Sequence, residues 1–296
     1  MSPADFIHPE DEAALRQLQN LPGFTAFIKK FMALGYETQK YGVNMASAIR
    51  LSEHQLPELY HRLPPICEKL GIPEPEFYLE MNPHPNALTS GDTKVFIKIN
   101  SSIVEMMDDE ELDAIIAHEC GHILCHHVLY GMVAQWLKTG LDALGILGRL
   151  SDPIKYALFY WYRKSELSAD RAAAIITSPE TVARTMARLA GGPKNLTSNI
   201  DFDEWAKQAD EYESIRNSNL WNKTLQIHAV LLENHPFAAV RVREILKWGK
   251  SDQYQTIKKS LTAPDIALIG SGHNCPNCGK PLGDDWAFCR HCGQKL

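Results

Sequence analysis

The sequence has no excess of positive charge. Its 296 residues include 30 lysines and arginines against 36 aspartates and glutamates, which gives a formal net charge of −6 at pH 7. A protein that binds a nucleic acid backbone needs basic side chains to neutralise the phosphates. We therefore do not expect nucleic acid as the main partner.

Long apolar runs and an N-terminal leader are also missing. A membrane-spanning helix needs about 20 consecutive apolar residues, and the most apolar stretch, roughly 142–162, is interrupted by Arg149, Asp152, Pro153 and Lys155. The first ten residues lack the basic and then apolar segments of a secretory signal. We expect a cytoplasmic protein in which the apolar stretch is a buried helix, with peripheral membrane association as the alternative.

The seven cysteines offer no sensible disulfide framework. Four of them form a metal-like pattern near the C-terminus, and the other three are Cys67, Cys120 and Cys125. This usage is typical of a reducing compartment. We expect Cys120 and Cys125 to be small core residues and not reactive thiols.

Short strands are expected in the first half of the chain. Residues 77–79 and 94–99 are two runs of strand character, separated by the turn-rich segment 82–92. The composition is that of an ordinary globular protein, with 45% hydrophobic and 22% charged residues. The pattern predicts one small sheet.

Helices are expected over most of the remaining chain. Apolar spacing in residues 10–72 predicts several short helices that form a scaffold without chemistry of their own. The capping patterns Ser102–Glu105 and Asp108–Glu111 predict a short helix and then a longer one that runs to about Met132. Another helix is expected at 154–176, before a Ser-Pro pair. The fold class predicted is therefore α+β and mainly helical.

The longer helix carries the pattern HExxH. In this pattern His118 and His122 are four residues apart, so that both side chains lie on one face of the helix. This is the spacing of two metal ligands, and Glu119 between them has the position of a general base. The alternative is an ordinary helix that happens to contain two histidines.

A catalytic zinc needs a third protein ligand and an open position for water. The metzincin pattern is excluded, because position 128, where that class has a histidine, is Val128. Glu166 and Asp170 share one face of the helix expected at 154–176. Glu166 can ligate zinc, while Asp170 can accept the free ring N–H of a zinc-bound histidine. The alternative is that both are solvated carboxylates beside basic neighbours.

These motifs together resemble peptidase family M48, a group of gluzincins that includes the HtpX-type and Ste24-type proteases. The resemblance rests on His118–His122, Glu166–Asp170, the Asn-Ala pair at 86–87 and the His-Pro motif within Asn234–Arg241. It covers about residues 60–250. It departs from the family's multi-pass membrane members, because no segment of this sequence has the length and composition to span a bilayer.

The chemistry of peptide hydrolysis and the resemblance together suggest roles for further residues. Glu119 is placed to take a proton from the attacking water and pass it to the leaving amine. The resemblance implies that His235 stabilises the oxyanion, with a purely structural role as the alternative. Arg241 is expected to order this region through ion pairing, and Arg243 is the other candidate for that role.

The segment around Asn86 and Ala87 is similar to the family's edge-strand element. It would offer backbone groups to an extended substrate by strand addition, and a plain hairpin turn is the alternative. His126 and His127 follow the HExxH motif. We interpret both as structural, because a third histidine ligand beside Glu166 would close the open position.

The last residues contain two CxxCG knuckles separated by ten residues, formed by Cys275 with Cys278 and Cys289 with Cys292. Four thiolates can hold a structural zinc, and a unit of this size has too little core to fold without one. The segment resembles a zinc ribbon. We expect it to dock a protein partner or to regulate the enzyme; a redox CxxC has no supporting context.

The sequence therefore predicts a zinc-dependent endopeptidase with one catalytic and one structural zinc. We divide the chain into an N-terminal helical segment packed on the core (1–60), a gluzincin-type zinc metallopeptidase domain with a small sheet (61–260), a linker (261–273) and a zinc ribbon (274–296). One alternative is a catalytically silent zinc-binding scaffold or adaptor. Another is a zinc hydrolase that acts on non-peptide bonds.

Overall fold

The computed structural model describes residues 1–139, 151–219 and 237–262. The chain divides into two compact units, 1–255 and 256–296, and all packing and site geometry below belongs to the first.

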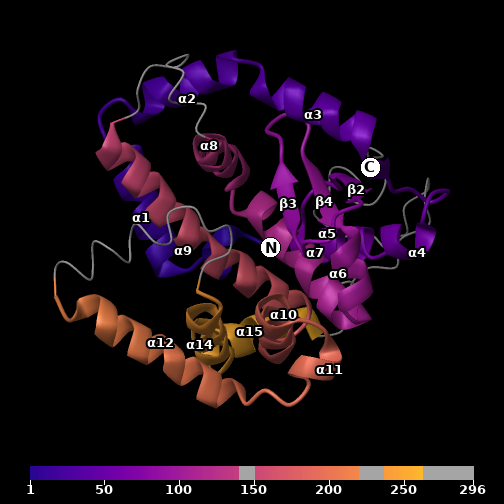
Figure 1. The fold of residues 1–296 in the computed structure, drawn as a ribbon, viewed down its shortest axis with the longest axis vertical. Helices are drawn as coiled ribbons and strands as arrows, with labels where there is room; N and C mark the ends of the chain where they lie inside the picture. Colours follow the sequence, from indigo (N-terminus) through magenta and orange to yellow (C-terminus); the bar gives the residue numbers. More distant parts are fainter. Residues whose placement is uncertain (140–150, 220–236, 263–296) are drawn as a thin grey trace, which may run out of the picture. The chain divides into compact units, whose positions relative to one another are not determined.

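The described part confirms the α+β, mainly helical class predicted from the sequence (Figure 1). Its helices are η1 (Pro3–Asp5), α1 (Pro9–Gln19), α2 (Phe24–Ala33), α3 (Tyr36–Ser47), α4 (Pro57–Tyr60), α5 (Leu63–Leu70), α6 (Ser101–Met106), α7 (Asp109–Leu124), α8 (Val128–Lys138), α9 (Asp152–Ile176), α10 (Pro179–Gly191), α11 (Lys194–Thr197), α12 (Phe202–Asn217), α14 (Ala238–Gly249) and α15 (Asp252–Thr262).

The sheet contains four strands in the order β1-β2-β4-β3, with the bounds β1 (Ile49–Arg50), β2 (Glu76–Glu80), β3 (Ala87–Ser90) and β4 (Phe96–Asn100). Strands β2 and β4 are the two predicted runs, and they pair in parallel. Strand β3 pairs antiparallel with β4 and forms one edge of the sheet. It lies within the segment that the sequence indicated as turn-rich, because Asn, Pro and Gly surround a core of only four strand residues.

Helix α7 begins as predicted and ends earlier than predicted. Asp108 accepts a hydrogen bond from the Glu111 backbone, and the Glu111 carboxylate accepts one from the Asp108 backbone, which completes the capping box. The helix stops at Leu124, since His126 adopts a left-handed backbone conformation (φ 58°) that an α-helix does not contain. The single helix expected to reach Met132 is thus two helices, α7 and α8.

The short helix α6 also differs from its predicted start. It begins at Ser101, so that Ser102 lies inside the helix and does not cap it. Asn100 precedes the helix, and its side-chain amide donates to the His84 carbonyl. The predicted Ser102 capping box is therefore wrong.

Helices α7 and α9 pack closely, and Gly121 permits the approach. A Cβ at this position would lie 2.7 Å from the Ala172 Cβ and 3.1 Å from the Ala169 Cα, both on α9. Backbone and alanine atoms have no rotamer that could relieve such contacts. Small residues on both helices therefore set the spacing at which α9 side chains reach those of α7.

Gly121→Ala should destabilise the folded protein by about 1–3 kcal/mol, because the added methyl group forces α7 and α9 apart. Denaturant titration monitored by circular dichroism measures the change. Gly131→Ala on α8 is a matched control, since a Cβ there would meet only the Tyr162 ring at 3.5 Å, an ordinary contact. That control should leave stability unchanged or raise it by about 0.5–1 kcal/mol through helix propensity. Equal effects of the two substitutions would contradict the packing argument.

The N-terminal helices pack against α8 and α9. A buried cluster of aromatic and aliphatic side chains joins α1, α2, α8 and α9, and it includes Phe24, Phe27, Phe31, Trp136 and Trp161. Figure 1 shows α1 alongside α9. In the described ranges, no helix combines the length and apolar character that a bilayer crossing needs.

Candidate metal centre

Three side chains from two helices converge at the α7–α9 contact. His118 and His122 lie on the same face of α7, and Glu166 faces them from α9. The Nε2 atoms of the two histidines are 3.2 Å apart. Each is 3.5 Å from a Glu166 oxygen, His118 from Oε2 and His122 from Oε1. All three residues belong to one group whose ligand atoms lie within 4.8 Å of one another.

The dimensions of this group fit a zinc ion. Ligand atoms placed about 2.0–2.2 Å from a tetrahedral zinc lie about 3.3–3.6 Å from one another. The 3.2 Å between the two Nε2 atoms and the 3.5 Å from each of them to a different Glu166 oxygen are close to these values. Two nitrogens and one carboxylate also match the ligand types of catalytic zinc sites, which leave a fourth position for water.

Asp170 and Arg241 surround the ligands from behind. The Asp170 Oδ1 lies 3.0 Å from the His118 Nδ1, the ring nitrogen that faces away from the other ligands. Arg241 donates from Nε and Nη2 to the two Asp170 oxygens, at 2.7 and 2.6 Å, and its Nη1 is 3.1 Å from Glu166. One guanidinium thus holds two carboxylates, and both are buried. This arrangement fixes the direction in which each of them points.

The charged groups around His118 favour a positive charge at its ring. Burial alone would lower the pKa of His118, but hydrogen bonds with Asp170 and Glu166 outweigh burial and raise its pKa to about 9. Burial would raise the pKa of Asp170, but Arg241 and His118 outweigh it and hold that pKa below its ordinary value. A metal ion that binds here therefore replaces a proton on His118.

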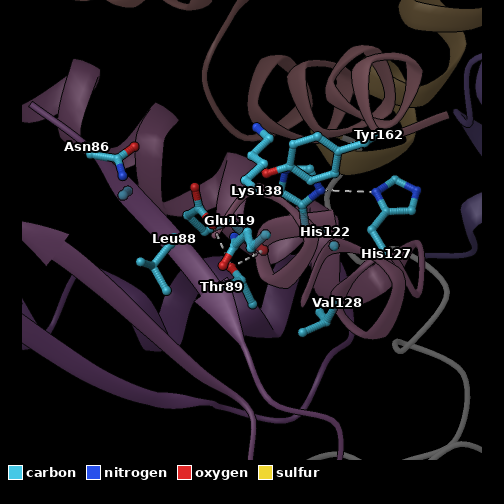
Figure 2. A pocket seen from close by; sticks show the side chains of 12 residues that line it. Asn86, Leu88, Thr89, Glu119, His122, His127, Val128, Lys138 and Tyr162 are labelled. Atoms are coloured by element: carbon cyan, nitrogen blue, oxygen red, sulfur yellow. Dashed lines mark hydrogen bonds between the residues drawn. The ribbon is translucent and has the colours of Figure 1, made fainter. Parts of the chain in front are cut away.

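Glu119 lies beside the ligands and turns toward the sheet. The Thr89 hydroxyl of β3 donates to the Glu119 Oε2 at 2.6 Å, and Figure 2 shows the two side chains pointing toward each other. Glu119 is buried, with 3% of its surface exposed. Sequence reasoning did not single out Thr89 as a partner of this glutamate, although it lies in the segment suggested as an edge strand.

Two cavities flank Glu119. One has a volume of about 210 Å³ and is bounded by Asn86–Thr89 on the sheet side and by His122, α8 and Tyr162 on the other (Figure 2). The second, of about 40 Å³, is bounded by Asn86, Ala87 and mostly apolar side chains of α7, α9 and α10. Asn86 and the edge strand β3 therefore border both cavities next to the convergent ligands.

A chain of polar contacts, one hydrogen bond and one ion-pair contact, leads from His122 to the N-terminal helix. The His122 Nδ1 is 3.1 Å from the His127 Nδ1, and the His127 Nε2 is 3.0 Å from the Asp11 Oδ2. Figure 2 shows this hydrogen bond as a dashed line between the His122 and His127 rings. Residues 10–72, predicted to form a scaffold without chemistry of their own, thus include one residue, Asp11, that contacts a histidine next to the site. No local pattern marks Asp11, which reads as one of three acids in the first turn of α1.

His126 and Arg243 do not take part in the group of side chains described above. His126 is exposed and does not follow the helical stripe, because its backbone is left-handed. Arg243 forms ion pairs with Asp210, Glu213 and Glu244. Of the two arginines considered, Arg241 is the one that reaches the site.

Several predicted residues lie outside the described ranges. These are His235 and the four ribbon cysteines Cys275, Cys278, Cys289 and Cys292. Most of the predicted linker also lies outside, apart from its first two residues, which end α15. Their roles stay predictions.

Comparison with known families and proteins agrees with this geometry. Residues 52–249 match the model of peptidase family M48, and residues 274–296 match the model of a zinc-ribbon domain. The first match spans more than half of the chain and contains both helices that meet at the candidate metal centre.

Named relatives are peptidases. The chain is 31% identical over 260 residues to the plastoglobule-localized metallopeptidase 48, chloroplastic, of Arabidopsis thaliana, which covers 86% of this chain and 75% of the relative. It is 26% identical over 246 residues to a protease HtpX homolog of Trichormus variabilis, covering 73% of this chain and 82% of the relative. A protease HtpX homolog of Tropheryma whipplei is 27% identical over 153 residues, 49% of this chain and 50% of the relative. No solved structure matches the chain.

Proposed function

The chain belongs to peptidase family M48 and is a metalloprotease, and we propose that it cleaves internal peptide bonds of protein substrates with a zinc ion held by His118, His122 and Glu166. The observation that carries this proposal is the group of three convergent side chains, His118, His122 and Glu166, with the buried Glu119 beside it. A structural metal site has no need of a carboxylate next to an open ligand position. This feature favours an enzyme over a silent scaffold.

Glu119 is the proposed proton carrier. When bound, zinc polarises the scissile carbonyl and lowers the pKa of water. Glu119 follows directly after a proposed ligand and borders the cavities beside the three convergent side chains, so it can take the proton of the attacking water and deliver it to the leaving amine. Thr89 holds one of its oxygens at 2.6 Å and thereby limits its rotation.

Asp170 and Arg241 act by orientation. Asp170 accepts a hydrogen bond from the ring of His118 when that ring is neutral and ligates through Nε2, which fixes the tautomer that binds zinc. Arg241 holds both Asp170 and Glu166 in place. Neither residue needs to contact the substrate for this role.

Strand β3 is the proposed binding edge for the substrate. An extended peptide can add to the side of β3 opposite β4 and would then pass between the two cavities beside Glu119. Asn86 and Ala87 would contact its backbone. The smaller cavity offers space for a small apolar side chain of the substrate. We further propose, from the family resemblance, that His235 stabilises the oxyanion.

The zinc ribbon is proposed to hold a second, structural zinc through its four cysteines. We propose that it binds a protein partner and thereby brings substrates to the peptidase, with the domain boundaries at 60, 260 and 273 expected from the sequence. The name of the plant relative places that protein at plastoglobules. For this chain we propose the cytoplasm, with peripheral membrane contact as the alternative.

A cleavage assay on the full-length protein tests the proposal. The zinc-loaded chain, incubated with an unfolded protein substrate, should produce fragments whose new termini lie inside the substrate sequence, as determined by mass spectrometry. Removal of zinc with 1,10-phenanthroline should stop cleavage, and added zinc should restore it. A chain that binds zinc at the helical site but cleaves no peptide bond would favour the scaffold or a non-peptide hydrolase.

A further inference from the structure

We propose that Asp11, acting through His127, is a positioning residue that sets the tautomer and orientation of the metal ligand His122. The inference rests on the proposed function, because it assumes that His122 ligates zinc. It adds a part of the chain that lies before residues 52–249, the range that matches the peptidase family. The argument starts from the ligand and follows the hydrogen bonds outward.

The direction of each hydrogen bond follows from the direction of the His122 ring. Its Nε2 faces His118 and Glu166, so this nitrogen is the one available to a metal. A neutral ligand that uses Nε2 carries its proton on Nδ1. That proton points to the His127 Nδ1 at 3.1 Å, which must then act as an acceptor. A neutral His127 consequently carries its own proton on Nε2.

The Asp11 carboxylate contacts this nitrogen of His127 as an ion-pair partner. Its Oδ2 lies 3.0 Å from the His127 Nε2. The remaining partners of the carboxylate are donors as well: the Trp161 indole N–H at 2.9 Å to Oδ1 and the Ser168 hydroxyl at 2.5 Å to Oδ2. All three of these neighbours of the carboxylate can donate to it.

Two members of this chain of contacts are buried, and His122 is partly buried. Asp11 is fully buried and His127 is 2% exposed, so that water does not compete for these groups. Ser168 also accepts a hydrogen bond from the His8 backbone at 3.0 Å, and His8 caps α1. The start of α1 is thereby tied to α9 at a residue that lies between Glu166 and Asp170. The position of Asp11 is fixed relative to the ligands.

The two histidine ligands are thus supported in different ways. His118 contacts the Asp170 carboxylate directly, at 3.0 Å. On the side away from Glu166, His122 reaches the Asp11 carboxylate through the ring of His127. Both arrangements end in a buried carboxylate, and groups that orient metal-bound histidines raise metal affinity about 10- to 100-fold. Asp11 should contribute an effect of this size.

Asp11→Asn in the full-length protein tests the inference. An asparagine keeps one acceptor oxygen, but its amide N–H₂ replaces the other oxygen. One of the donors of His127, Trp161 and Ser168 then faces another donor and loses its acceptor. Cadmium-113 NMR separates an ion bound by nitrogen and oxygen from one bound by thiolates, and chelator competition followed by this signal measures affinity at the helical site. We expect about 10- to 100-fold weaker binding there and an unchanged thiolate site. Glu12→Gln, the same chemical change at the next residue, should leave both sites unchanged because Glu12 pairs with Arg16 on the surface.

A second measurement needs no substitution. Nitrogen-15 NMR of the imidazoles in the loaded wild-type chain should find the proton of His122 on Nδ1 and that of His127 on Nε2. A proton on Nδ1 of His127, or a folded Asp11→Asn variant with wild-type affinity, would overturn the inference. A wild-type chain that binds cadmium only through thiolates would instead overturn the proposed catalytic site, so the two failures are distinguishable.

Discussion

Replacing Glu119 with glutamine should lower kcat on a peptide substrate by a factor of about 10² to 10⁴, because it removes the group that carries the proton from water to the leaving amine. The metal ligands are untouched, so the zinc content should stay at its wild-type value. Glutamine has nearly the same shape and can still accept a hydrogen bond from Thr89, which now bonds Glu119 at 2.6 Å. The substitution is therefore expected to lower the rate of peptide cleavage and to leave the fold unchanged.

Single-turnover cleavage of a fluorogenic peptide measures this effect, together with elemental analysis of the same sample. Glu110→Gln is the matched control on the same helix, since Glu110 lies in the first turn of α7 and pairs with Arg184. It should retain wild-type activity. Appreciable turnover by Glu119→Gln would mean that another group acts as the base.

The second large effect is expected for Glu166→Ala. The substitution leaves two protein ligands where catalytic zinc sites have three, and it removes one partner of His118, His122 and Arg241. The chain should lose the zinc of the helical site and all peptidase activity. The zinc of the ribbon should remain, because its four cysteines are an independent set of ligands.

Elemental analysis distinguishes the two sites. We expect about two zinc ions per wild-type chain and about one in Glu166→Ala. The reciprocal double variant, Cys275→Ser with Cys278→Ser, should also hold about one and should keep the helical site. Two zinc ions in Glu166→Ala would show that Glu166 is not a ligand, and one zinc ion in the wild-type chain would contradict the ribbon assignment.

Features set by neighbours along the chain could be predicted from the sequence. The capping box at Asp108 and Glu111 places the start of α7, and the spacing of His118 and His122 then follows from helix geometry alone. Helix α9 was expected at 154–176 and runs from Asp152 to Ile176. That α7 and α9 meet could be predicted for two reasons. A catalytic zinc needs a third protein ligand, and the family resemblance includes Glu166 and Asp170.

Features set by contacts far apart in the sequence could not be predicted. The break at His126 depends on one backbone angle, while apolar residues continue at helical spacing from α7 into α8. Strand β3 exists because β4 offers it a partner, and four residues among turn formers give too weak a signal on their own. The contact of Asp11 with His127 joins the first turn of α1 to the residue before α8, and neither residue belongs to a recognisable motif.

The family match begins later in the sequence than the residues that contact α9 and its neighbours. The match starts at residue 52, whereas Asp11, His8 and the buried Phe6 already contact α9 or its neighbours, and the carbonyls of Phe6 and Ile7 accept hydrogen bonds from Arg171. A fragment cut at the border of the family match would contain every proposed metal ligand, yet it would leave Trp161, Ser168 and His127 without the Asp11 carboxylate that all three contact. The family match therefore delimits the residues that fit the family model, while the contacts around the proposed metal site extend to the N-terminal helix.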